Sequence, residues 1–360
     1  MTLLDKLLKY ARGKNASDLH VVSGNYAFMR VNGDMIPIKE ANILSPMKVS
    51  RIFVPILSPK NRKILSKECQ VDFALEFDAE TRYRVNVYKT QTGLAGAFRQ
   101  IPTKIQTLED LNAPSILKDF TKERNGLVLV CGPTGSGKST TLAAMVDYRN
   151  TNFEDHIITI EEPLEFIHQS KKSLVNHREV GKTAKTFAQS LRGALREDPD
   201  VIMVGEMRDR ETIHLALTAA ETGHLVFATL HTSSAAKTID RIIDVFSDSE
   251  KPMVRSMLST SLRGVISQTL VKKKDGTGRI AVHEIMVVNT SVGNLIRENK
   301  IAQIESMMQI GKKYGMITLK DQAQKLLDEG IVDFKDIENI LRKTGEIAMV
   351  SKASQKPGEQ

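Results

Sequence analysis

The sequence is poor in cysteine and in aromatic residues, and these shortages exclude several classes of protein. Its two cysteines, Cys69 and Cys131, lie far apart, so a four-cysteine zinc site is impossible and nothing requires an oxidising compartment. Tryptophan is absent and aromatic residues make up only 5% of the chain, which leaves few platforms for stacking nucleic-acid bases. No apolar run approaches the ~20 residues that span a bilayer, and the N-terminal segment lacks the pattern of a signal peptide. We therefore expect a cytoplasmic protein that touches a membrane only through a partner or a basic surface.

The chain does have the composition of a soluble globular protein of two or three domains. It contains 360 residues, of which 41% are hydrophobic and 26% are charged. Its 51 lysines and arginines exceed its 43 acidic residues, which gives a net charge of +8 at pH 7 and a pI near 9.3. That excess indicates an anionic partner, either a nucleotide, a nucleic acid or an acidic membrane, or else a generally basic surface.

Two kinds of hydrophobic pattern divide the chain. Residues 1–100 alternate apolar and polar positions, as in FMRVNGDMIPI (28–38), which predicts a small strand-rich domain with flanking helices. Residues 101–113 have no sustained period, as in a linker between domains. We expect a second domain over residues 114–345 and a disordered polar tail over residues 346–360.

The second domain has the pattern of an α/β domain built on a parallel sheet. Short continuous apolar runs alternate with helix-like stretches, as in strands that are buried on both faces. Helical periodicity then dominates from residue 235 to about residue 342, with one further strand-like run at residues 279–288. The four buried runs are LVLV (127–130), HIITI (156–160), VIMV (201–204) and LVFATL (225–230).

The clearest motif is a phosphate-binding loop between the first buried run and a helical stretch. The segment GPTGSGKST (132–140) fits G-x-x-x-x-G-K-[ST] in the strand-to-helix context that this motif requires. Its glycines let backbone N–H groups converge on phosphates, while Lys138 can neutralise phosphate charge and the Ser139 hydroxyl can ligate Mg²⁺. The predicted nucleotide-binding residues are Gly132, Pro133, Thr134, Gly135, Ser136, Gly137, Lys138, Ser139 and Thr140.

Two acidic segments follow buried strands of the second domain. Glu206 comes two residues after the end of VIMV, at the end of a parallel strand where ligands gather, and is placed to face Mg²⁺ or its water molecules. The segment EEPLE (161–165) follows HIITI and carries three carboxylates, one of which can orient the attacking water. The spacing does not say which one, and an exposed acidic loop remains an alternative.

Histidines and arginines supply further candidates. His224 and His231 flank LVFATL, and His231 follows the strand's carboxyl end, where it can hydrogen-bond a γ-phosphate; a structural role is the alternative for either histidine. NTPase rings often supply arginine charge to a neighbouring γ-phosphate, but the pattern singles out no arginine. The candidates are Arg82, Arg84 and Arg99 in the first domain and Arg192, Arg196, Arg208 and Arg210 in the second.

Together these elements resemble the secretion ATPases of the type II and type IV pilus systems, and specifically the PilT-like pilus retraction motors. The resemblance covers about residues 1–345, and residues 191–246 carry its most specific motifs, a Walker B segment followed by a His box. EEPLE resembles the family's Asp box, with Glu162 where Asp is more usual, and RVNGD (30–34) resembles its N-terminal domain. The implied fold is α/β, a RecA-like P-loop ATPase core with a smaller N-terminal α+β domain that is PAS-like.

The resemblance also implies roles for residues of the site. Lys138, Ser139 and Thr140 would bind phosphate and Mg²⁺, with Ser139 and Glu206 holding the metal. Glu206 would be the Walker B acid and Glu165 the general base.

The resemblance implies that five further side chains contact the nucleotide. His231 and His224 would sense the γ-phosphate, with His231 the stronger candidate. Arg84 and Arg99, with Arg82 beside them, would reach a nucleotide across the domain or subunit boundary.

The implied function is that of a homohexameric ATPase that uses ATP and Mg²⁺ to disassemble a type IV pilus and so drives twitching motility. The implied partners are an inner-membrane platform protein and a paralogous retraction ATPase, with no direct contact to nucleic acid. The protein would lie in the cytoplasm at the inner-membrane base of the pilus machine.

A further departure from the family pattern and three alternatives accompany this interpretation. The family segment A-I-R-N-L-I-R-E appears as SVGNLIRE (291–298), which lacks the first arginine. A PilU-like accessory ATPase is one alternative. A pilus-extension or secretion ATPase would usually have a longer N-terminal region and a four-cysteine zinc insert, and a nucleic-acid translocase finds no helix-turn-helix, RRM or OB signature here.

Overall fold

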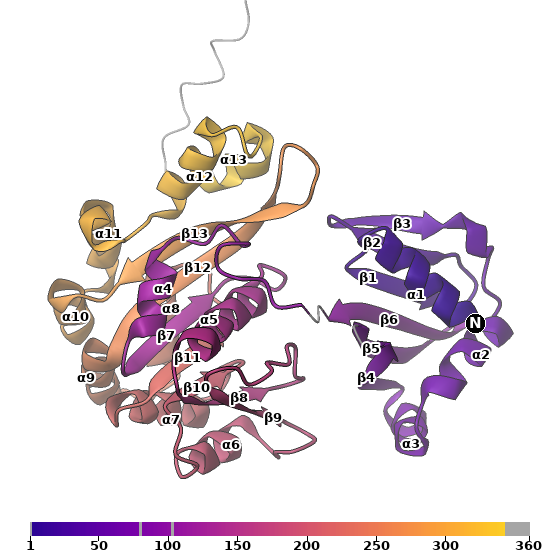
Figure 1. Ribbon diagram of the computed structural model, residues 1–360, viewed down its shortest axis with the longest axis horizontal. Helices are drawn as coiled ribbons and strands as arrows, with labels where there is room; N and C mark the ends of the chain where they lie inside the picture. The colour runs from indigo at the N-terminus through magenta and orange to yellow at the C-terminus, as the bar shows by residue number, and fades with distance from the viewer. Residues whose placement is uncertain (1, 79–80, 102–103, 343–360) are drawn as a thin grey trace, which may run out of the picture. The chain divides into compact units, whose positions relative to one another are not determined.

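The computed structural model describes residues 2–78, 81–101 and 104–342. The chain divides between Lys104 and Ile105 into two compact units, each with its own sheet and core (Figure 1). No helix within the described ranges has both the length and the apolar character of a membrane span.

The first unit is an antiparallel sheet with helices packed on one face. Its six strands lie in the order β3-β2-β1-β6-β5-β4, and each neighbouring pair is antiparallel. The strands are β1 (Asp18–Val22), β2 (Ala27–Val31), β3 (Asp34–Ile38), β4 (Gln70–Asp78), β5 (Thr81–Thr90) and β6 (Gly93–Ile101). The helices are α1 (Leu3–Gly13), η1 (Lys39–Ala41), α2 (Pro46–Ile56) and α3 (Pro59–Glu68).

The sequence accounts for the packing of this unit. Helix α1 begins with a capping box between Thr2 and Asp5 and buries an apolar stripe that includes Leu4 and Leu8. These side chains join a core with alternate residues of the strands, such as Val85 and Val87 of β5. The opposite sheet face keeps the polar side chains of the alternation, as a sheet packed on one side requires.

The second unit is built on a seven-stranded sheet in the order β13-β12-β7-β11-β10-β8-β9. All neighbouring pairs are parallel except β12 with β13, which form an antiparallel hairpin. The strands are β7 (Gly126–Cys131), β8 (His156–Glu161), β9 (Leu174–Glu179), β10 (Val201–Val204), β11 (Leu225–Leu230), β12 (Leu262–Lys272) and β13 (Arg279–Val287). The expected α/β fold with a parallel sheet is therefore confirmed.

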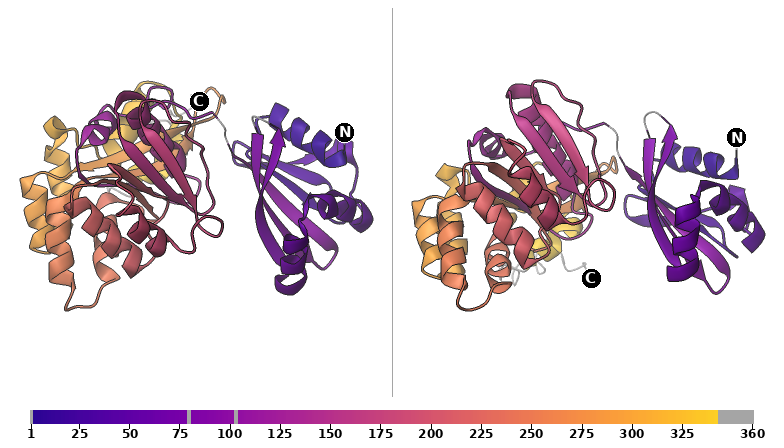
Figure 2. Two further views of the ribbon diagram at one scale, coloured as in Figure 1. Left: turned by 60° about the horizontal axis from the view of Figure 1, so that its bottom comes forward. Right: turned by 90° about the horizontal axis from the view of Figure 1, so that it is seen from below.

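Helices cover both faces of this sheet, as Figures 1 and 2 show. Leu127 and Leu129 of β7 point into one core, and Val128 and Val130 point into the other. The helices are α4 (Ile116–Lys122), α5 (Lys138–Asn152), α6 (Phe187–Ala194), α7 (Arg210–Glu221), α8 (Ala235–Asp244), α9 (Lys251–Ser261), α10 (Thr290–Arg297), η2 (Ile301–Gln303), α11 (Ile304–Ile310), η3 (Lys312–Tyr314), α12 (Leu319–Asp328) and α13 (Phe334–Arg342).

The structure differs from the sequence pattern at three places. Strand β12 lies where helical periodicity was expected, because both of its faces are largely buried and no alternation marks it as a strand. Strand β9 was also not anticipated from the pattern. Leu108, inside the expected linker 101–113, is buried in a core of the second unit, so the second unit begins earlier than the pattern indicates. The expected tail 346–360 lies outside the described residues.

Candidate nucleotide-binding and catalytic site

The GPTGSGKST segment forms the turn between β7 and α5, as its motif predicts. Gly137 is the N-cap of α5 in a left-handed conformation, with φ of 87°. At Gly132, with φ of 147°, a Cβ atom would lie 2.3 Å from the backbone oxygen of Gln268, so only glycine fits there. The loop therefore lies at a helix N-terminus, where N–H groups and the helix dipole favour anions.

Lys138 lies inside this loop. Its Nζ donates hydrogen bonds to the backbone oxygens of Gly132, at 2.8 Å, and Pro133, at 3.0 Å. Burial lowers the pKa of Lys138, while the negative charges of Glu206 and Glu165 act in the opposite direction. The lysine and these two predicted acids are thus close enough to interact, although they come from three separate segments.

The sheet order explains that convergence. Strands β11, β10 and β8 are parallel neighbours, so their carboxyl ends meet at one edge of the sheet. His231 follows β11, Glu206 lies just beyond β10, and the segment EEPLE begins at the end of β8. The sheet edge therefore gathers one histidine and several carboxylates beside the phosphate-binding loop.

Arg208 connects the carboxylates of this edge. Its Nη2 lies 2.7 Å from Glu206 Oε2, and its Nη1 lies 3.6 Å from Glu162 Oε2. On the other side of Glu206, His231 Nε2 lies 3.3 Å from Oε1. Burial alone would raise the pKa of Glu206, but Arg208 and, to a smaller extent, His231 outweigh it and hold that pKa below its ordinary value. Glu206 therefore carries a negative charge at neutral pH.

Glu161 and Glu165 have contrasting surroundings. Glu161 is almost fully buried, and burial raises its pKa to about 8. Its Oε2 accepts a hydrogen bond from the backbone N–H of Glu165 at 3.1 Å, whereas Glu165 itself is only partly buried. Glu161 therefore holds the backbone of the segment in place through this hydrogen bond. Glu165 is the member of this pair whose carboxylate a water molecule can reach.

The two predicted histidine sensors separate in space. His224 precedes β11, so it lies at the amino end of the strand whose carboxyl end carries His231. The His224 ring lies 3.0 Å from the backbone oxygen of Ala219 through Nδ1. Within this chain His224 does not join His231 and Glu206, because a strand of the sheet separates them.

The three predicted arginines of the first unit lie on one face of its sheet. Arg84 of β5 and Arg99 of β6 are exposed partners directly opposite each other. Arg99 Nε lies 2.8 Å from Oδ1 of the buried Asp18, while Arg82 is mostly buried and lies 3.9 Å from Glu76. Arg84 is therefore the freest of the three to reach an anion.

Sequence reasoning did not find Gln268 of β12. Its Nε2 donates a 2.7 Å hydrogen bond to the backbone oxygen of Ser136 in the phosphate-binding loop, and the side chain is buried. Within the described ranges, its Oε1 has no partner. The segment that contains Gln268 has no motif, so a correct strand prediction beside β7 was the only signal that could have indicated it.

The oxygen donors at this edge suit Mg²⁺. The ion prefers oxygen ligands, keeps several water molecules and shares its shell with substrate phosphates, so few protein ligands are needed. The Ser139 hydroxyl at the start of α5 and the ionised Glu206 carboxylate are donors of this kind. No cluster of three or more His, Cys, Asp or Glu with metal-binding geometry occurs in the described part of the chain.

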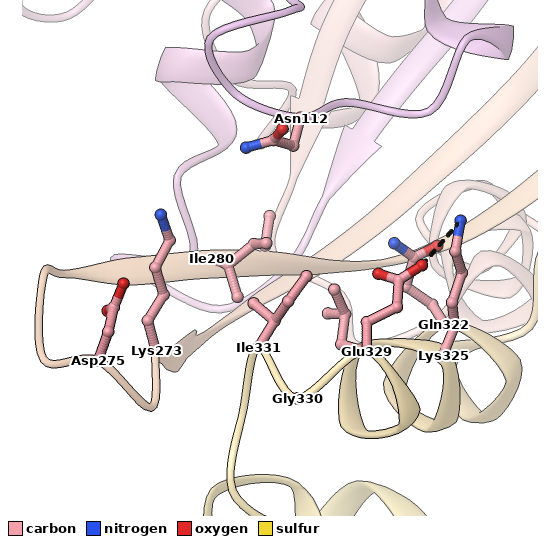
Figure 3. Close-up of a pocket in the computed structure, with 11 residues that line it drawn as sticks. Asn112, Lys273, Asp275, Ile280, Gln322, Lys325, Glu329, Gly330 and Ile331 are labelled. Atoms are coloured by element: carbon pink, nitrogen blue, oxygen red, sulfur yellow. Dashed lines mark ion pairs between the residues drawn. The ribbon is translucent and has the colours of Figure 1, made fainter.

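The second unit also contains a cavity of about 530 Å³ away from these residues (Figure 3). It lies between the tip of the β12–β13 hairpin and the end of α12, where Lys325 and Glu329 form an ion pair of 3.8 Å. Asn112 closes another side. None of the phosphate-binding or acidic residues described above lines it, so it takes no part in the site.

The chain is similar to known proteins along most of its length. The family described as "Type II/IV secretion system protein" matches residues 1–342. A "Twitching motility protein" from Neisseria gonorrhoeae is 52% identical over 322 residues, which cover 88% of this chain and 86% of the relative. The "Type IV pilus retractation ATPase PilT" of Pseudomonas aeruginosa is 51% identical over 331 residues, covering 91% and 95%.

A more distant relative and a solved structure complete the comparison. The "Type IV pilus ATPase PilU" of Pseudomonas aeruginosa is 37% identical over 332 residues, covering 92% of this chain and 87% of the relative. The crystal structure of the "Pilus Retraction Motor PilT and Bound ADP" superposes with a TM-score of 0.84 at 43% identity, covering 94% of this chain and 96% of that chain.

Proposed function

The chain belongs to the family of type II/IV secretion system proteins, and from this membership and the geometry of its site we propose that it retracts a type IV pilus by hydrolysing ATP. It is an ATPase of the PilT type. The observation that carries the proposal is the similarity to a pilus retraction ATPase along nearly the whole of both chains. The convergence of Lys138, Glu206 and Glu165 gives that similarity a chemical basis.

The retraction ATPase is favoured over the accessory PilU type. Identity to PilT exceeds identity to PilU by a wide margin over similar lengths. One departure remains in α10, where Gly293 replaces the arginine that the PilT-like pattern has. A Cβ on Gly293 would lie 2.9 Å from the backbone oxygen of Ser259, so α10 packs too closely there for a larger residue. Any role of that arginine is therefore absent from this chain.

In the proposed mechanism ATP is held by backbone N–H groups of the phosphate-binding loop and by Lys138, which neutralises phosphate charge. Glu165 takes a proton from the attacking water and orients it toward the γ-phosphate. His231 hydrogen-bonds that phosphate and registers its loss through Glu206. Mg²⁺, held by Ser139 and Glu206 together with the phosphates, would supply charge neutralisation of the transferring group.

Force would come from a change in the relative orientation of the two units within a homohexamer. ATP binds one orientation better than the other, so its binding and release shift the population between them. Arg84 and Arg99, with Arg82 beside them, would contact the nucleotide across the domain or subunit boundary. A paralogous ATPase could join the same ring.

The distribution of charge supports a membrane-facing partner. Residues 1–104 contain 17 lysines and arginines and nine acidic residues, whereas residues 105–360 contain 34 of each. The net positive charge therefore belongs to the first unit. We infer that its helices face the inner-membrane platform protein or the anionic lipid around it, which would place the protein on the cytoplasmic side of that membrane. The exposed basic residues on α1, α2 and α3 are Lys6, Lys9, Arg12, Lys48, Arg51, Lys60, Arg62, Lys63 and Lys67.

The test of this function is deletion of the gene in its host, with complementation by the wild-type gene and by Lys138→Ala. Excess surface pili with lost twitching motility, restored only by the wild type, are the expected result. Bald cells would instead identify an extension motor. Unchanged pili with normal or weakened motility would identify an accessory ATPase of the PilU type.

The base assignment needs a separate test on the purified protein. Glu165→Gln is expected to lower kcat by about 100-fold or more, because a general base contributes about 10²- to 10⁴-fold. Glu162→Gln is the matched control, since Glu162 lies in the same segment and contacts Arg208. An unchanged kcat in Glu165→Gln would refute the assignment.

A further inference from the structure

The loop that carries Glu165 has no regular structure of its own. Residues 162–173 connect β8 to β9 and contain neither helix nor strand. A general base must be held within a fraction of an ångström of its working position, whereas irregular loops are the most mobile parts of a fold. Something outside the loop must therefore fix it.

Asn150, in the last turn of α5, is the first anchor. Its side chain is completely buried and uses both of its polar ends on the loop. Asn150 Nδ2 donates to the backbone oxygen of Gln169 at 2.8 Å, and Oδ1 accepts from the backbone N–H of Lys171 at 3.0 Å. Its own backbone oxygen accepts from the N–H groups of Lys172, at 3.0 Å, and Ser173, at 3.3 Å. One asparagine thus satisfies four backbone groups of the loop.

His177, on β9, is the second anchor. Its Nε2 lies 3.1 Å from the backbone nitrogen of His168 and 3.2 Å from the backbone oxygen of the same residue. Its Nδ1 lies 2.8 Å from Thr159 Oγ1 on the neighbouring strand β8. The rings of His168 and His177 stack with centroids 5.9 Å apart and planes 20° apart. The loop is therefore attached to the sheet at residue 168.

These anchors leave few residues beside the proposed base whose backbone is not fixed by a hydrogen bond. The backbone N–H of Glu165 is bound to Glu161, and the next fixed residue is His168, so only Phe166 and Ile167 lie between. Phe166 is itself buried. Moreover, α5 begins at Lys138, so the helix that carries the phosphate-binding lysine at one end clamps the loop at the other.

We propose that Asn150 and His177 are positioning residues that hold the Glu165 loop in register with the phosphate-binding helix. The inference rests on the proposed function, because it assumes that Glu165 acts in hydrolysis. It assigns to both residues an effect on kcat without contact to ATP.

The test compares isosteric and non-isosteric variants. Asn150→Asp keeps an acceptor for Lys171 but places an oxygen against the carbonyl of Gln169. His177→Leu removes the polar contacts of the ring with His168 and Thr159. We expect both to lower kcat by roughly 10- to 100-fold, the effect of a displacement of about 1 Å, with a small change in KM for ATP. His177→Gln, whose amide can still accept from His168, should recover most of the activity. The matched control is Asn152→Asp, because Asn152 is exposed and its side chain donates a hydrogen bond to the backbone oxygen of Tyr148, in its own helix and not in the loop.

Hydrogen exchange supplies a readout that is independent of activity. The backbone amides of His168 and Lys171 should exchange faster in Asn150→Asp and His177→Leu, but not in Asn152→Asp, when exchange is measured well below the melting temperature of each variant. Unchanged amide exchange in Asn150→Asp and His177→Leu would overturn the positioning role. So would faster exchange with full kcat in these variants, if Glu165→Gln is inactive. Either result would leave the base assignment standing. Full kcat in Glu165→Gln as well would show that the base assignment of the proposed function has failed.

Discussion

Arg208 Nη2 lies 2.7 Å from Glu206 Oε2, so the acid at the end of β10 is paired with an arginine only two residues further along the chain. Because Arg208 also reaches toward Glu162 at 3.6 Å, one guanidinium balances carboxylates from two neighbouring strand ends. This pairing is what keeps Glu206 ionised against the effect of its burial.

Removal of Arg208 should therefore shift the pH dependence of hydrolysis. In Arg208→Gln the pKa of Glu206 rises, because burial then acts with less opposition. The acidic limb of the plot of kcat/KM against pH should move to higher pH. Arg210→Gln is the control, since Arg210 pairs with Glu250 instead. Equal shifts in the two variants would contradict this account.

Glu161 should make stability depend on pH. Its pKa in the folded protein is about 8 against an ordinary value of 4.5, so the fold favours the neutral acid. This stabilisation is fully present below pH 4.5 and is lost as the pH rises through 8. Glu161→Gln is neutral at every pH. The melting temperature of this variant minus that of the wild type should therefore be larger at pH 8.5 than at pH 5.

The ATPase activity of Glu161→Gln tests whether Glu161 or Glu165 is the general base. The glutamine oxygen can still accept the hydrogen bond from the Glu165 N–H, so Glu161→Gln should retain most of its ATPase activity. A loss as large as that of Glu165→Gln would mean that the wrong acid has been assigned as base.

The two histidines beside β11 should differ in their effect on turnover. His231→Ala removes the contact with Glu206 and should lower single-turnover hydrolysis by roughly 10-fold or more, within the range of one polar group at a reacting centre. His224→Ala should have a much smaller effect, because His224 lies at the opposite end of the strand. Similar losses would place His224 at a nucleotide site after all.

Two glycines of the phosphate-binding loop should differ in their effect on stability. In Gly135→Ala the added Cβ has no atom within 4 Å. The free energy of unfolding should fall only by the cost of the left-handed backbone conformation, about 1 kcal/mol. Gly132→Ala adds a collision with the backbone oxygen of Gln268, which should bring its cost to roughly 3 kcal/mol. Thermal unfolding should rank the variants in that order, and equal melting temperatures would show that the loop relaxes freely.

The local parts of the site could be predicted from the sequence. The glycine pattern, Lys138 and the acids that follow buried strands are each contained in a few consecutive residues, and parallel strands bring their carboxyl ends to one edge. The contacts of Gln268 could not, because it is separated from its partner Ser136 by 132 positions and lies in a strand without alternation. Asn150 and His177 were also missed, because they bind backbone groups of the irregular loop between β8 and β9, and no sequence motif marks such contacts.

The sequence by itself determined the kind of chemistry, because a phosphate-binding loop and acidic strand ends are patterns of neighbouring residues whose local geometry follows from the backbone. Only the tertiary structure decided how the surroundings of the three carboxylates of EEPLE differ. Glu161 is buried and held neutral, Glu162 faces Arg208, and Glu165 keeps access to water. These differences come from desolvation and nearby charge, which depend on what packs around each side chain rather than on the order of residues in the chain.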